Sequence, residues 1–89
     1  MILLAALLQA APVPADVVVV ARKRRCDVSV ANRILSSREF DARAAEWAAG
    51  VPVRVSAPDS SSRKCLAKIV FRLADRGVTR VEFVEAALQ

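Results

Sequence analysis

Residues 51–84 read VPVRVSAPDSSSRKCLAKIVFRLADRGVTRVEFV, and this stretch predicts a strand, a helix and a second strand in succession. Residues 51–55 alternate apolar and mostly polar side chains, and Pro52 suits a strand start or an edge because it cannot donate a ladder hydrogen bond. Residues 78–84 form the last predicted strand. The helix between them is predicted over residues 63–76 by apolar side chains at helical spacing, namely Leu66, Ile69, Val70, Leu73 and Ala74.

The residues before this stretch predict two more strands and another helix. The β-branched run 16–21 and the alternating run 27–31 are separated by a short polar break, which is typical of a hairpin. Ser36 and Glu39 have the spacing of a capping box, and apolar side chains at helical spacing follow them up to Gly50. We therefore predict an α+β fold of two layers, in the order β-β-α-β-α-β.

In this fold, two helices pack on one face of a small mixed four-stranded sheet, because right-handed crossovers place both on the same side. The opposite face of the sheet then carries polar side chains into water, namely Ser29, Arg54, Arg80 and Glu82. The core is predicted to contain Phe40, Trp47, Val53, Leu66, Ile69, Val70, Leu73, Val81 and Phe83.

Residues 1–15 have the composition of a cleavable signal peptide. Their apolar run is too short to span a bilayer, and Val13 and Ala15 fit the small-residue cleavage pattern. Cleavage after Ala10 is an alternative, and the segment lacks the usual Lys or Arg near its start. An uncleaved membrane-anchoring helix is the other interpretation, although Asp16 and two prolines argue against it. We expect a signal peptide over residues 1–15, and a single exported domain over residues 16–89.

Cys26 and Cys65 are the two cysteines, and in a small exported chain such a pair predicts one disulfide. Neither lies in a CxxC motif and the chain has no histidine, so a zinc site or a redox motif is not indicated. A regular arrangement of these elements would place the two cysteines at opposite ends of the domain. That separation would exceed the roughly 7 Å between Cα atoms that a disulfide tolerates.

The net charge of +5 favours contact with anionic partners, and it is most concentrated at Arg22, Lys23, Arg24 and Arg25. This run is either a solvated hairpin turn or a basic patch that binds nucleic acid or anionic lipid. No aromatic residue is interleaved for base stacking, which makes nucleic acid the less favoured ligand.

The sequence shows no constellation of residues that would indicate catalysis. There is no histidine for acid–base chemistry, and the two glycines both follow predicted helices, so no phosphate-binding loop is indicated. The serine run 60–62 suits a loop and a helix cap, and Trp47 fits the core better than an exposed ligand platform. We expect no catalytic residue, no metal and no cofactor, and hence a protein that is not an enzyme.

In this order of elements, residues 17–84 resemble the periplasmic domain of the ExbD/TolR biopolymer-transport family. The matching segments are the strand 17–21, the turn region 28–36, the strand 51–55 followed by Ala57-Pro58-Asp59, and above all 76–81, Arg-Gly-Val-Thr-Arg-Val. The resemblance implies the same fold, a periplasmic location, a tendency to dimerise, and binding to an envelope protein or to peptidoglycan.

The family carries an N-terminal transmembrane helix with a proton-coupling aspartate, whereas this chain is predicted to keep no transmembrane segment after signal cleavage. The motor function of the family is therefore not carried over. Residues 16–22 are also similar to the TonB-box peptide of outer-membrane receptors, although a first β-strand explains them equally well. The function expected from the sequence is a non-catalytic periplasmic interaction module, and the alternative is a basic-patch binder that uses residues 22–25.

Overall fold

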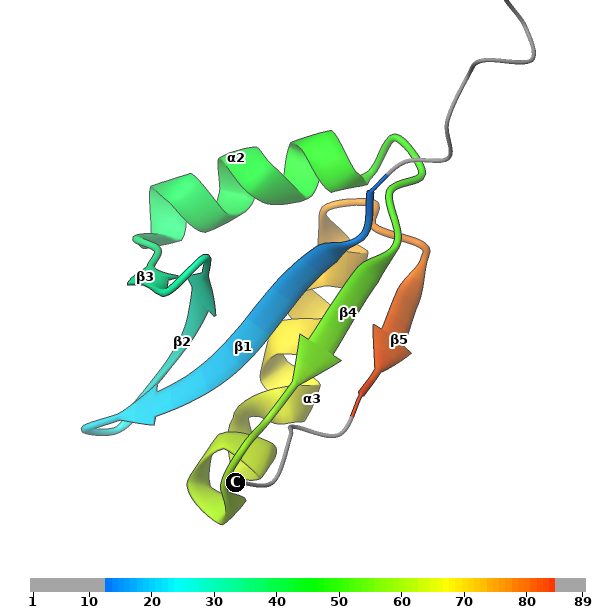
Figure 1. Cartoon of the computed structure of the whole chain (residues 1–89). Helices are drawn as coiled ribbons and strands as arrows, with labels where there is room; N and C mark the ends of the chain where they lie inside the picture. Colours follow the sequence, from blue (N-terminus) through cyan, green and yellow to red (C-terminus); the bar gives the residue numbers. More distant parts are fainter. Residues whose placement is uncertain (1–12, 85–89) are drawn as a thin grey trace, which may run out of the picture.

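The computed structural model describes residues 13–84, which form one sheet with two helices packed against it (Figure 1). Most of the predicted signal peptide and the tail 85–89 lie outside the described residues. The strands order as β3-β2-β1-β4-β5, with β1 parallel to β4, β4 parallel to β5, and the remaining pairs antiparallel. The elements are β1 (Ala15–Arg22), β2 (Arg25–Val30), β3 (Arg33–Ile34), α2 (Ser37–Trp47), β4 (Val53–Ser56), α3 (Ser60–Asp75) and β5 (Val81–Phe83).

The α+β prediction is confirmed, with one strand more than expected. The additional strand is β3, which pairs with β2 through a second hairpin. The turn of this hairpin consists of Ala31 and Asn32, both with positive φ. This strand was not predicted, because two paired residues are too few to give an alternation signal.

Both helices begin with the caps that their sequences encode. Glu39 N–H donates to Ser36 Oγ at 3.1 Å while Ser36 N–H donates to Glu39 Oε1 at 2.9 Å, so the predicted capping box is present. Asp59 caps α3 by accepting from Ser62 N–H at 2.7 Å. After α2, Gly50 has a φ of 107°, which a side chain would disfavour.

The core lies between the helices and one face of the sheet. Phe40 is 1% exposed and Trp47 is 5% exposed, with their ring centroids 6.5 Å apart in an edge-to-face arrangement. Phe40, Trp47, Val53, Ile69 and Leu73 are buried as predicted, whereas Leu66, Val70 and Val81 are only partly buried. Several further residues outside the predicted core are also buried, namely Val17, Val19, Val28, Leu35, Ala44, Val55, Cys65 and Val78.

Phe83 was wrongly placed in the core, since its side chain is 60% exposed. The last strand is also shorter than residues 78–84, because the residues before it finish α3. Val78 N–H donates to Leu73 O at 3.0 Å, and Gly77 N–H donates to Ala74 O at 3.0 Å. These bonds satisfy carbonyls at the helix end, and the strand begins only at Val81.

Candidate functional site

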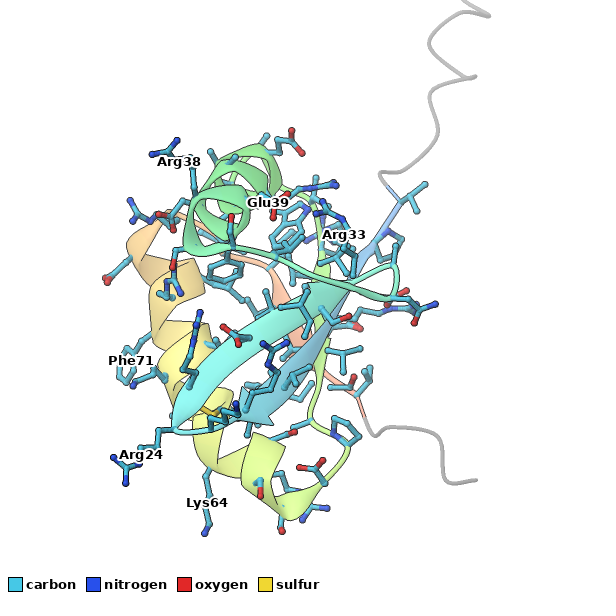
Figure 2. The ribbon with its side chains drawn as sticks, turned by 90° about the vertical axis from the view of Figure 1, so that its left-hand side faces the viewer. Arg24, Arg33, Arg38, Glu39, Lys64 and Phe71 are labelled. Carbon is cyan, nitrogen blue, oxygen red and sulfur yellow. A yellow bond between two sulfur atoms is a disulfide. The ribbon has the colours of Figure 1, made fainter. Side chains whose placement is uncertain are left out.

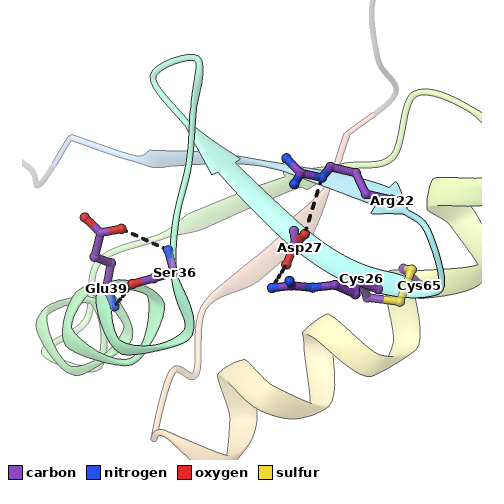
Figure 3. Close-up of polar contacts among 7 residues, drawn as sticks. Arg22, Cys26, Asp27, Ser36, Glu39 and Cys65 are labelled. Carbon is purple, nitrogen blue, oxygen red and sulfur yellow. Dashed lines mark hydrogen bonds and ion pairs between the residues drawn. A yellow bond between two sulfur atoms is a disulfide. The ribbon is translucent and has the colours of Figure 1, made fainter.

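The basic run lies at the tip of the β1–β2 hairpin. Arg22 and Arg25 are paired across the two strands, and their guanidinium groups lie 3.8 and 3.6 Å from the Asp27 carboxylate (Figure 3). Lys23 and Arg24 form the two-residue turn itself and are exposed. The predicted hairpin is therefore present, and Asp27 partly neutralises the charge of Arg22 and Arg25.

Cys26 and Cys65 form a disulfide that joins β2 to the start of α3, with their Cα atoms 5.5 Å apart (Figure 3). The concern that they would lie at opposite ends was wrong. Since β4 runs parallel to β1, both strands end at the same side of the sheet. The hairpin follows β1 and α3 follows β4, so the hairpin tip and the first turns of α3 meet there.

An apolar groove lies between α3 and β5, and the sequence analysis did not predict it. It measures about 460 Å³ and is lined by Arg63, Leu66, Ala67, Val70, Phe71 and Phe83. The Phe71 ring is 72% exposed and, like Phe83, offers an apolar surface to solvent. We call this feature the α3–β5 groove. Its one sequence signal is that Phe71 falls outside the apolar stripe of its helix, where a polar residue is usual.

β5 forms an open edge beside this groove, because the sheet order places it last among the described strands. Arg80 O accepts from Val53 N–H at 2.7 Å, and Val84 N–H donates to Val55 O at 3.0 Å. Since backbone groups alternate in direction along a strand, those of Val81 and Phe83 point away from β4. The edge therefore offers donors and acceptors to a further strand.

The remaining polar contacts fix the architecture around this surface. Asp41 on α2 accepts from Arg72 on α3 at 3.4 Å and from Arg76 at the C-cap of α3 at 3.0 Å. The Arg72 guanidinium lies 4.6 Å from the centroid of the Phe40 ring. Trp47 is buried, which excludes the exposed ligand platform considered from the sequence. The serine run 60–62 forms the first turn of α3.

The uncovered sheet face carries an ion pair between neighbouring strands. Arg54 donates to both carboxylate oxygens of Asp16, at 2.8 and 3.3 Å. The hydrogen bond from Arg54 lowers the pKa of Asp16 below its ordinary value. Both side chains are largely exposed, so this contact fastens the start of β1 to β4 without forming an enclosed site.

Comparison of the chain with protein-family models, with curated proteins and with solved structures finds no match. The resemblance to the ExbD/TolR family therefore remains a prediction. Neither helix of residues 13–84 has the length and apolar character needed to cross a membrane. The candidate site is therefore inferred from the structure alone. It has two parts, which are the α3–β5 groove with its open strand edge, and the basic hairpin tip that the disulfide joins to α3.

Proposed function

We propose that this chain is a non-catalytic interaction module of the bacterial periplasm, which binds an extended segment of an envelope protein. The observation that carries the proposal is the pairing of an open strand edge with an exposed apolar groove. β5 supplies the backbone groups of Val81 and Phe83, and the groove lies beside it on the helix side of the sheet. Edge and groove together have the form that strand addition requires.

A strand that pairs with β5 would direct alternate side chains toward α3. Val81 and Phe83 are in register with the buried residues Val53 and Val55, so their side chains face the helices. Every second residue of an added strand would therefore reach the groove, where it would cover Phe71 and Phe83. The backbone bonds would supply affinity and the groove would select apolar side chains, which makes an extended segment with alternating apolar residues the preferred ligand.

The periplasmic location is supported by the composition of residues 1–15 and by the disulfide. Disulfides persist mainly in oxidising compartments, and this one joins elements that are far apart in the sequence. The ExbD/TolR-like order of elements adds support for an envelope partner, and it also makes peptidoglycan the alternative ligand.

Site-specific crosslinking tests the proposal directly. The photoreactive residue p-benzoylphenylalanine would replace Phe83 in the chain expressed with its leader in a Gram-negative bacterium, and illumination would then trap whatever covers the groove. The matched control places the same residue at Ile34, which is exposed on β3 at the opposite edge of the sheet. We expect a discrete adduct with one envelope protein from position 83, and none from position 34.

Three results would contradict this function. An adduct between two copies of the chain would show that β5 serves self-association. Equal adducts from both positions would show that contact is unspecific. Absence of an adduct, together with co-sedimentation of the purified protein with peptidoglycan sacculi, would make the cell-wall polymer the ligand.

A further inference from the structure

Four cations lie on the hairpin tip and on the first three turns of α3, two elements that the Cys26–Cys65 disulfide joins. They are Lys23 and Arg24 of the turn, and Lys64 and Lys68 of the helix, and we call them the basic face. The Cys26–Cys65 disulfide holds the two elements together, with Lys64 adjacent to one cysteine in the chain. Figure 2 shows Arg24 and Lys64 pointing outward near each other. Among residues 13–84, no carboxylate lies within ion-pair distance of these four side chains.

The two cations of the turn have a backbone conformation that is unfavourable for their residue types. Lys23 and Arg24 have φ angles of 40° and 67°, in the left-handed region that two-residue hairpins usually fill with Asn and Gly. Left-handed backbone is unfavourable for residues with a Cβ atom, and adjacent like charges repel each other. The basic turn is therefore costly to the folded state, and such a local cost is often found where a residue serves binding.

The outward side of α3 combines these cations with an exposed ring. Lys64, Lys68 and Phe71 follow the i, i+4, i+7 spacing of one helix face, and the Phe71 ring is 72% exposed. Figure 2 shows Phe71 pointing away from the body of the protein on the left, above Arg24, with Lys64 pointing out below. Cations around an outward apolar ring are typical of surfaces that rest on a bilayer, with the ring at the level of the headgroups. Asp75, one turn beyond Phe71, ends the basic stretch.

We propose that the basic face docks this domain on an anionic lipid bilayer. The headgroup phosphates neutralise the four cations, and the Phe71 ring enters the interface. The hairpin tip and the start of α3 both lie at the lower end of the domain in Figure 1. All four cations lie outside the lining of the α3–β5 groove, and Phe71 is the one residue that the docking shares with it. The charge-dependent part of the inference therefore does not depend on the proposed function.

Co-sedimentation with vesicles tests this docking. The purified protein should bind vesicles that contain phosphatidylglycerol in preference to vesicles of phosphatidylcholine alone, and added salt should weaken the binding. The double variant Lys64→Gln/Lys68→Gln should lower the partition coefficient about 25-fold, at about fivefold per cation. The control Arg38→Gln/Arg43→Gln removes the same charge from exposed positions on α2, and should change it less than about twofold.

A second variant keeps the test valid if the helix changes disturb folding. Lys23→Asn/Arg24→Gly supplies the residues that this turn prefers, so it should raise the melting temperature while it lowers the partition coefficient. If the α3 double variant and the α2 control lowered the partition coefficient equally, the binding would depend only on net charge. That result would overturn the proposal. Failure to prefer the phosphatidylglycerol vesicles would overturn it too. Binding to a short DNA duplex without binding to vesicles would make the basic face a nucleic-acid surface instead.

Discussion

Reducing the Cys26–Cys65 bond should lower the free energy of unfolding by about 4 kcal/mol. The two cysteines are separated by 39 positions. In the chain-entropy model, closing a loop of this length removes roughly 13 cal/mol/K from the unfolded ensemble, or about 4 kcal/mol at 25 °C. This is a large share of the 5–15 kcal/mol that is typical of folded domains. For a domain of this size, the melting temperature should fall on the order of 20 °C.

The assay is urea unfolding with and without a phosphine reductant, followed by the fluorescence of Trp47, which is the single tryptophan and is buried. The dependence of the unfolding free energy on urea should also become steeper on reduction, because the unfolded chain expands and exposes more surface. In the control variant Cys26→Ala/Cys65→Ala, the reductant should have no effect. A loss below about 1 kcal/mol would refute the entropic reasoning, and two thiols that react in the native protein would refute the pairing itself.

Three further predictions concern the caps and the core. Ser36→Ala should cost about 1 kcal/mol and lower the melting temperature by about 4–8 °C in a thermal scan, and an unchanged value would mean that the capping box is not formed in solution. Phe40→Ala should cost about 3–5 kcal/mol in urea unfolding, whereas Phe83→Ala at the exposed edge should cost less than about 1 kcal/mol. Similar losses for the two would contradict the burial described above. Acidification should destabilise the fold, because two carboxylates at the helix starts have lowered pKa values. The backbone N–H of Ser36 holds the pKa of Glu39 below the ordinary 4.5, and the backbone N–H of Ser62 holds the pKa of Asp59 below the ordinary 3.8. The unfolded chain then binds protons first, so this stabilisation is complete above the ordinary values and is lost as the pH falls through the lower native ones. Denaturation midpoints that stay constant between about pH 5 and pH 3 would refute this assignment.

Local signals in the sequence were sufficient for the order of the described elements apart from β3. Ser36 with Glu39 encodes a helix start within four residues, and Gly50 marks the end of the same helix region. Leu66, Ile69 and Leu73 show the helical period of α3 without any knowledge of the sheet. These features depend on neighbours in the chain, which is why they could be predicted.

The candidate site depends instead on where the elements lie in space. Phe83 alternates with polar residues as a core residue would, but its strand is at the edge and α3 covers only part of it. The groove forms because α3 packs on only part of β5, and a local sequence pattern does not show how far a helix extends over a strand. The meeting of Cys26 with Cys65 likewise depends on the parallel alignment of β1 with β4, since this alignment brings the hairpin and α3 to one end.

The central position of β1 has a consequence for how the chain is made. Among the described elements β1 is synthesised first, yet one of its two sheet neighbours, β4, begins only at Val53. Until then, the valine-rich edge of residues 17–20 has no partner on that side, and such an edge invites pairing with other chains. A chain truncated after Trp47 should therefore aggregate, whereas the chain through Val84 should remain monodisperse. The edge of β1 is therefore exposed to pairing with other chains until the second half of the sequence has been made.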